Sequence, residues 1–174
     1  FIHKARIKSG EISTNSQITL NVDKSRREKI KRNHTATHLL HAALREIIGI
    51  HVRQSGSLVH PDYLRFDFTN LESLTNSMIK KIEDKVNEYI RNNLEVEVCH
   101  TTYNKAIEDG ALAFFDDKYE LDVRTIKIDA PWSFELCGGT HMNRTGGIGL
   151  FKIISESGIG SGNRRIFAST GVGT

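Results

Sequence analysis

Hydrophobic residues follow two kinds of periodicity along this chain. Apolar side chains three and four positions apart predict two long helices, over residues 25–48 and 70–92. Segments that alternate apolar and polar residues, or that lie between turn residues, predict strands at 51–60, 64–68, 94–98, 123–128, 148–155 and 163–170. Because these elements are interspersed without a regular βαβ repeat, the sequence predicts an α+β fold with a largely antiparallel sheet and packed helices.

Polar residues and glycines set the limits of the predicted helices. Two pairs of residues have the spacing of a capping box and would begin the long helices: Ser25 with Glu28, and Thr69 with Glu72. Gly49 is the expected end of the first helix. A short helix and a turn around Gly110 are predicted over residues 104–113.

The first 22 residues have a pattern of their own. Alternating apolar residues on both sides of a Ser9-Gly10 turn predict two strands. We therefore expect residues 1–24 to be the end of a small β subdomain or a linker, and residues 25–174 to form a separate domain. The start on Phe1, directly in strand-like sequence, favours a piece of a longer protein.

The composition is that of an ordinary globular domain. Of the 174 residues, 38% are hydrophobic and 26% are charged, which excludes a disordered or repetitive chain. The longest apolar runs are too short to span a bilayer, and the N-terminus lacks a signal-peptide core, so we expect a cytoplasmic protein without a membrane partner. Two cysteines are too few for a disulfide framework and favour metal binding or packing.

Positive charge is concentrated near the N-terminus. Residues 1–53 contain eleven lysines and arginines against four aspartates and glutamates. The densest basic run, residues 24–32, leads directly into the first predicted helix. Such runs are usually a solvated helix face, but beside a functional site they can also attract a polyanion.

Candidate metal ligands lie in two short segments with the same spacing. His34 and His38 are four residues apart and therefore share one face of the first helix. Cys137 and His141 repeat this spacing far along the chain. Three histidines and one cysteine form a donor set that suits zinc. From spacing alone, the helix histidines are equally explained as partly buried residues satisfied by backbone or water, and we expect His41 to support the helix.

Five blocks of sequence occur in a recognisable order. They are Asn-His-Thr-Ala-Thr-His-Leu-Leu at 33–40, Gln-Ser-Gly-Ser at 54–57, Arg-Phe-Asp-Phe at 65–68, Cys-Gly-Gly-Thr-His at 137–141 and the segment 147–153. Together they closely resemble the editing domain of the alanyl-tRNA synthetases. They are more distantly similar to free-standing AlaX-type editing proteins and to the editing domain of threonyl-tRNA synthetase.

This resemblance implies an editing-domain fold and a proofreading activity. The reaction would hydrolyse the ester that joins serine or glycine to the 3′ end of alanine tRNA. The acceptor end of alanine tRNA and the rest of the synthetase would be the partners. The cofactor would be one Zn²⁺ per chain, held by His34, His38, Cys137 and His141. No segment resembles the aminoacylation domain, so we do not expect this chain to charge tRNA.

The resemblance also suggests residues that handle the substrate. Gln54 would lie in the aminoacyl pocket. Glu135 occupies the position at which threonyl editing domains carry an acidic residue, and it is our candidate for the general base. A zinc ion with four protein ligands is closed like a structural site. Either one histidine binds loosely, or the coordination expands, or the metal mainly orients the substrate.

Selectivity requires more than the size of the pocket, because serine is larger than alanine and glycine is smaller. A buried polar group that needs the seryl hydroxyl discriminates strongly, since an alanyl ester leaves that group unpaired. Gln54 is the first candidate for this group, although it can also be an ordinary polar strand residue. The hydroxyl of Thr37 is the second candidate.

Further substrate contacts are expected near the two glycine-rich segments. Gly138 and Gly139 would let the chain turn tightly and approach its neighbours closely, and with Thr140 they would face the substrate. Arg164 and Arg165 follow a glycine-rich loop and can hold phosphates of the acceptor end or pair with surface carboxylates. The residues assigned to substrate binding are thus Gln54, Thr37, Gly138, Gly139, Thr140, Arg164 and Arg165.

Several other residues favour structural roles. Asp67 would form a salt bridge on the sheet face, while Trp132 and Cys99 would pack. Phe167 stands where many relatives have an acidic residue, so no family role is transferred to that position.

Three other functions fit parts of the sequence. A free-standing AlaX-type deacylase shares the motifs, and a zinc-stabilised tRNA-binding module without catalysis would need the same ligands. A zinc peptidase is disfavoured, because the segment His-Thr-Ala-Thr-His lacks the glutamate expected after the first ligand.

Overall fold

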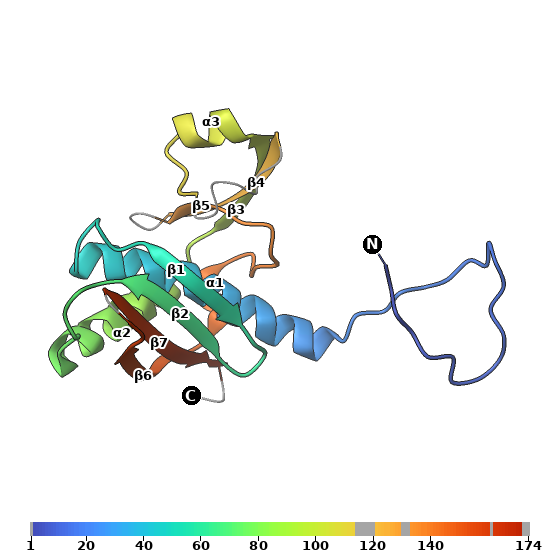
Figure 1. The fold of residues 1–174 in the computed structure, drawn as a ribbon, viewed down its shortest axis with the longest axis horizontal. Helices are drawn as coiled ribbons and strands as arrows, with labels where there is room; N and C mark the ends of the chain where they lie inside the picture. Colours follow the sequence, from blue (N-terminus) through green and yellow to red (C-terminus); the bar gives the residue numbers. More distant parts are fainter. Residues whose placement is uncertain (1, 114–120, 130–132, 161, 172–174) are drawn as a thin grey trace.

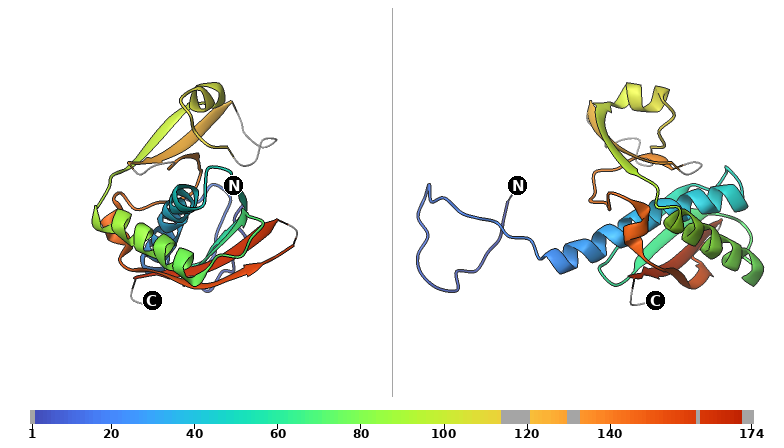
Figure 2. Two further views of the ribbon diagram at one scale, coloured as in Figure 1. Left: turned by 90° about the vertical axis from the view of Figure 1, so that its left-hand side faces the viewer. Right: turned by 180° about the vertical axis from the view of Figure 1, so that it is seen from behind.

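A four-stranded antiparallel sheet and two helices form the main body of the protein. The computed structural model describes residues 2–113, 121–129, 133–160 and 162–171. The strands are β1 (Gln54–Val59), β2 (Leu64–Thr69), β7 (Asn163–Thr170) and β6 (Phe151–Gly158), in this spatial order. Helices α1 (Lys24–Ile47) and α2 (Asn76–Arg91) cover one face of this sheet (Figures 1 and 2).

A second, smaller sheet lies to one side of this body. It contains β3 (Val96–Thr102), β4 (Asp122–Ile128) and β5 (Phe134–Leu136), all antiparallel, and carries the short helix α3 (Tyr103–Glu108) (Figure 1). The chain leaves β5, passes along α1 and reaches the 3-10 turn η1 (Thr145–Ile148) before β6. The fold is therefore α+β with antiparallel sheets, as the sequence predicts.

The core of the protein is centred on the second half of α1. Every residue from 35 to 44 is buried, because this part of the helix lies between the large sheet, α2 and η1. Phe66, Phe68 and Ile166 from the sheet are fully buried with Leu39 and Leu40. Burial of each such side chain contributes about 1.5–3 kcal/mol, so α1 is held firmly where it carries its histidines.

Both long helices begin at caps other than those predicted. The side chain of Asp23, not Ser25, accepts the N–H of Arg26 at the start of α1. Thr75 caps α2 by accepting the N–H of Met78. Thr69 cannot serve as this cap because it ends β2, where its hydroxyl bonds the backbone of the preceding segment.

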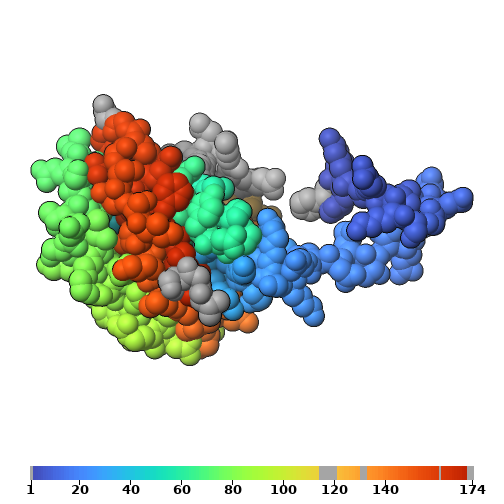
Figure 3. Space-filling view, turned by 90° about the horizontal axis from the view of Figure 1, so that it is seen from below, coloured from blue at the N-terminus to red at the C-terminus, as the bar shows by residue number. Residues whose placement is uncertain are grey.

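The strands predicted within the first 22 residues are wrong. The described residues 2–22 contain neither helix nor strand, and in Figures 1 and 3 this segment extends away from the body. An alternating sequence forms a strand only when a neighbouring strand and a core take up its bonds and its apolar face. Here the apolar side chains of this segment are exposed: Ile2, Ile7, Ile12, Ile18, Leu20 and Val22. The division at residue 24 stays a prediction.

Most of the remaining elements agree with the sequence within a few residues, but β5 and η1 were not predicted, and α2 begins at Asn76 rather than at residue 70. The pattern between the main helices identified β1 and β2, and the later patterns identified β3, α3, β4, β6 and β7. Asp67 forms the predicted salt bridge, with Arg165. Cys99 lies on β3 but is exposed, so the packing predicted for it is wrong. Trp132 lies outside the described residues. Within the described ranges, no helix has both the length and the apolar character needed to cross a membrane.

Asn33 joins α1 to one end of the large sheet, at the turn between β1 and β2 and at the last residue of β7. Its Nδ2 donates to the carbonyls of His60 (2.7 Å) and Pro61 (3.2 Å), and its Oδ1 accepts from Thr170 Oγ1 (2.8 Å). The side chain is almost completely buried. Since Asn33 directly precedes His34, these bonds also fix the first metal-ligand candidate.

Replacing Asn33 with Ala should lower the free energy of unfolding by about 2–3 kcal/mol, because buried carbonyl groups lose their donors. Thr170→Val is the control, since it removes one of the bonds and should cost about 1 kcal/mol. Denaturant unfolding monitored by circular dichroism measures both. An effect of Asn33→Ala below about 0.5 kcal/mol, the range of ordinary surface substitutions, would contradict this role.

Candidate metal centre

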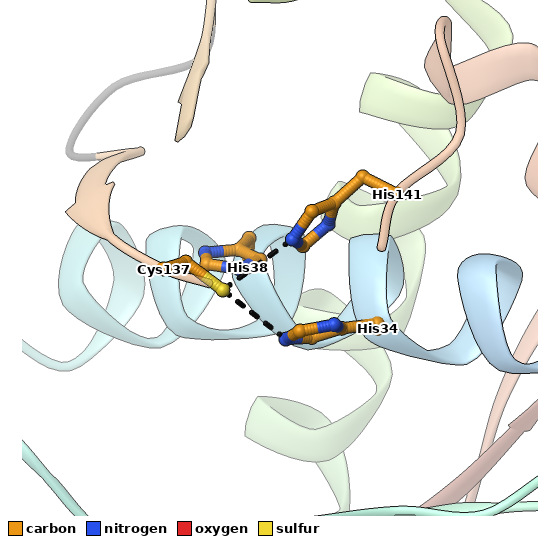
Figure 4. Close-up of side chains that lie close together, drawn as sticks. All are labelled: His34, His38, Cys137 and His141. Carbon is orange, nitrogen blue, oxygen red and sulfur yellow. Dashed lines mark hydrogen bonds between the residues drawn. The ribbon is translucent and has the colours of Figure 1, made fainter. Parts of the chain in front are cut away.

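Four side chains from two distant segments converge on one point. His34 and His38 lie on one side of α1, and the loop after β5 brings Cys137 and His141 opposite them (Figure 4). One nitrogen or sulfur atom from each residue lies within 4.8 Å of the others. The group can hold a metal ion, and it is the group expected from the sequence spacing.

The distances in the group fit tetrahedral coordination. Cys137 Sγ lies 3.4 Å from His34 Nε2 and 3.4 Å from His141 Nε2. With zinc–sulfur and zinc–nitrogen bonds of usual length, sulfur and nitrogen ligands of a tetrahedral site are separated by about 3.5 Å. These two pairs of atoms already have the spacing of such a site, and all four ligand atoms lie within 4.8 Å of one another.

His38 provides independent evidence for a bound ion. Its Nε2 is buried and has no hydrogen-bond partner among the described residues. Its Nδ1 lies 2.6 Å from Glu135 Oε2, on the other side of the ring. A buried polar nitrogen without a partner costs about 1–3 kcal/mol. A metal at the centre of the group would bind this nitrogen.

The electrostatics of the group favour a thiolate ligand. Burial opposes ionisation of Cys137, but hydrogen bonds with His141 and His34 and the attraction of His38 outweigh it and lower the thiol pKa to about 3. Burial also disfavours protonation of His141, and with repulsion from His38 and His34 it lowers that pKa to about 4. A thiolate and a neutral imidazole are the forms that bind metals.

The pKa of His38 shifts in the opposite direction to that of His141. Burial alone would lower its pKa, but attraction by Glu135 and interactions with Cys137 raise the pKa to about 10. Burial opposes ionisation of Glu135, but the charge of His38 and the hydrogen bonds with His38 and His41 outweigh it and hold the pKa of Glu135 well below its usual range. His38 would offer Nε2 to a metal at the centre of the group, while Nδ1 faces Glu135.

Gly139 has a steric role that differs from the one expected for a tight turn. Neither Gly138 nor Gly139 has a positive φ angle. However, a Cβ atom on Gly139 would lie 2.0 Å from Cε1 of His34, whereas one on Gly138 would meet nothing within 4 Å. The close approach predicted for this loop is thus confirmed at Gly139. The His34 ring occupies the space that a side chain at position 139 would need.

Two supporting residues escaped the sequence analysis. Arg124 Nη1 donates to the carbonyl groups of Cys137 and Gly139, both at 2.7 Å, and so holds the ligand loop on β4. Thr35 Oγ1 accepts the N–H of Met142 (3.0 Å) and lies 3.5 Å from His141 Nδ1. Thr35 lies inside the histidine motif, so the sequence could have suggested a supporting role for it. No local pattern indicates that Arg124, on β4, holds the ligand loop.

The two residues expected to recognise the amino acid lie on β1 and α1, and neither is one of the four metal-ligand candidates. Gln54 is half-buried at the start of β1, opposite Phe68. It shares the sheet face of Phe66, whose ring centroid is 5.4 Å from that of His41. Thr37 is buried on α1, where its hydroxyl donates to the carbonyl of Asn33 (2.8 Å).

Arg164 and Arg165 are both paired with carboxylates. Arg164 forms two bonds with Glu156 (2.5 and 2.8 Å), and Arg165 forms two with Asp67 (2.7 and 2.8 Å). The sequence allowed either phosphate binding or pairing with carboxylates for these arginines, and the structure shows the carboxylate pairs.

An open groove lies beside the metal group, at the basic start of α1. Its volume is about 390 Å³. It is lined by Val22, Asp23, Arg26, Arg27, Ile30, His34, Gly139 and Thr140. A ligand in this groove would therefore contact one proposed metal ligand, the glycine-rich loop and two arginines.

Comparison with known proteins relates the chain to tRNA synthetases. Residues 123–167 match the family described as threonyl and alanyl tRNA synthetase second additional domain. The chain is 52% identical over 170 residues to the alanine–tRNA ligase of Thermotoga maritima, and 53% identical over 169 residues to that of Halorhodospira halophila. These matches include 98% and 97% of this chain but 20% of each ligase. The chain thus spans about a fifth of the length of these relatives.

The contact between Gly139 and His34 predicts a selective loss of metal binding. Gly139→Ala should weaken the affinity for Co²⁺ roughly 10–100-fold, as loss of support for a ligand commonly does. Gly138→Ala, which places its methyl group in open space, should bind as the unmodified chain does. Titration against a chromophoric chelator measures both affinities. Equal affinities of the two variants would contradict this role of Gly139.

Proposed function

We propose that this chain is the editing-domain region of an alanyl-tRNA synthetase and that it hydrolyses mischarged alanine tRNA. The bond broken would be the ester that joins serine or glycine to the terminal adenosine. The observation that carries this proposal is the convergence of His34, His38, Cys137 and His141 within 4.8 Å, beside an open groove. It rests also on about 50% identity to alanine–tRNA ligases over nearly the whole chain.

We propose that the ion in this group is zinc, one per chain. One thiolate and three imidazoles are a donor set that zinc prefers. When bound, zinc would supply a positive charge that polarises or positions the ester carbonyl. The four side chains themselves hold the loop after β5 against α1 and so determine where the end of the substrate can lie.

The groove beside His34 is the proposed path of the acceptor end. Arg26 and Arg27 line it and would contact phosphates, while Gly138, Gly139 and Thr140 would face the terminal nucleotide. Arg164 and Arg165 remain proposed phosphate contacts. Because both already bind carboxylates, a phosphate would have to compete for their guanidinium groups.

Gln54 is the proposed sensor of the seryl hydroxyl. It lies on the inner face of the large sheet, near the side of α1 that carries His41. Its amide can bond a hydroxyl group, and an alanyl ester would leave that bond unmade. Thr37 is the second candidate, since its hydroxyl oxygen can still accept a bond while it donates to the helix.

Two alternatives involve the same metal group. A free-standing AlaX-type deacylase would perform the same reaction, but the similarity to a fifth of each ligase favours a part of a synthetase. A non-catalytic zinc-stabilised module would bind tRNA without hydrolysing the ester. A proofreading role in protein synthesis implies action in the cytoplasm.

Hydrolysis of charged tRNA tests the proposal directly. Alanine tRNA charged with serine, glycine or alanine is incubated with the chain, with and without a chelator, and zinc is measured in the same samples. We expect the seryl and glycyl esters to be hydrolysed faster than the alanyl ester, and the chelator to abolish the difference. Binding of tRNA without hydrolysis would support the non-catalytic module instead.

Cys137→Ala should remove zinc and deacylation together. Because it deletes a ligand, the loss of affinity should exceed the roughly 10–100-fold expected for a supporting residue. Cys99→Ala is the matched control, since Cys99 is exposed on β3, and it should retain both properties. Normal deacylation by zinc-free Cys137→Ala protein would refute the zinc-dependent mechanism.

Gln54→Leu should reduce hydrolysis of the seryl ester roughly 10–100-fold, because the hydroxyl loses its partner, and should leave hydrolysis of the glycyl ester nearly unchanged. Zinc content of the same variant is the control and should not change. Single-turnover rates with both esters measure the effect. An unchanged preference for seryl over alanyl ester would exclude Gln54 from the pocket.

A further inference from the structure

A buried carboxylate connects two histidines of α1 on the side of His38 away from the metal group. Glu135 is 3% exposed. Its Oε2 lies 2.6 Å from His38 Nδ1, and its Oε1 lies 2.8 Å from His41 Nδ1. Both rings are buried as well, so these three side chains form a continuous polar chain inside the protein.

The backbone of Glu135 is fixed from two sides. It pairs with Ile126 of β4 in the small sheet, and it forms an isolated bridge with Leu112. His38 and His41 are fixed by the buried part of α1. The carboxylate is thus a rigid connection between two elements that are far apart in the sequence.

We infer that Glu135 is a positioning residue, which orients His38 so that its Nε2 faces the metal group. A carboxylate that accepts the Nδ1–H of a metal-binding histidine fixes both the tautomer and the ring orientation. His41 contacts the second oxygen and helps to hold the carboxylate against His38. His41 therefore acts on the metal group through Glu135.

The geometry favours this role over that of a general base. A base must reach a reacting water or proton within hydrogen-bond distance. Both oxygens of Glu135 contact imidazole nitrogens, and the side chain is nearly inaccessible. By contrast, the open groove borders His34, Gly139 and Thr140.

The metal affinity of a Glu135→Gln variant tests the inference. Glutamine keeps the size of the side chain, but its NH₂ group must face one of the two Nδ1–H groups. We expect the affinity for Co²⁺ to fall roughly 10–100-fold, with a shift of the visible absorption bands of the Co²⁺ protein. Glu83→Gln is the control, because Glu83 joins α2 to β6 and should not affect either measurement.

Deacylation at saturating zinc separates the two roles of Glu135, and this part alone rests on the proposed function. A positioning residue should leave the rate within about tenfold of the unmodified chain, whereas loss of a general base should cost about 10²–10⁴-fold. Unchanged Co²⁺ affinity and spectrum with a rate loss of that size would overturn the inference. If the unmodified chain does not deacylate, the proposed function fails, and the Co²⁺ measurements still decide the role of Glu135.

A Glu135→Asp variant covers the case in which the glutamine variant does not fold. Aspartate keeps the charge but is one methylene shorter, so it cannot contact both rings from the same backbone position. We expect Co²⁺ affinity and spectrum to change in this variant too. Full retention of both would overturn the inference, because a negative charge that does not contact both rings would then be enough to position His38.

Discussion

The structure depends on the contact between α1 and the loop that follows β5. Three imidazoles and a thiolate meet there within 4.8 Å, and the hydrogen bonds of the described chain leave the Nε2 of His38 without a partner. Each buried polar atom of this kind costs about 1–3 kcal/mol. A bound cation would give this nitrogen a partner and attract the thiolate. The same four side chains would then bind the metal and join α1 to the loop after β5.

The two sheets have separate tasks in forming this contact. The large sheet buries the apolar side of α1 and fixes the helix through its core. The small sheet brings the ligand loop to the helix, and Arg124 on β4 holds the carbonyls of Cys137 and Gly139. Because one ligand pair belongs to each part, a small displacement of one sheet relative to the other would separate the pairs.

The sequence predicted what depends on local spacing and missed what depends on distant neighbours. Helical periodicity identified α1, and the spacing of its histidines identified two ligands, because both are properties of a single element. The strands expected in residues 2–22 required a partner that the alternating pattern does not reveal. The contacts of Arg124 with the ligand loop, and of Glu135 with both His38 and His41, cross between elements and therefore have no local signature. The caps were missed for a related reason, since Thr69 was already engaged by the segment before it.

The exposure of the four ligands indicates the direction from which a substrate can approach. His38 and His141 are buried, whereas His34 and Cys137 are partly exposed. The groove touches His34 but not His38, and Gly139 leaves the His34 ring close to the loop backbone. His38 is held from behind by Glu135, so it is the fixed side of the group. His34 contacts Cys137 within the group, and Gly139 supports its ring by leaving space rather than by a hydrogen bond. Because the groove borders this ring, His34 is the ligand whose position a molecule in the groove can most readily change. A closed set of four ligands can therefore be rigid on its buried side and still respond to substrate on its open side.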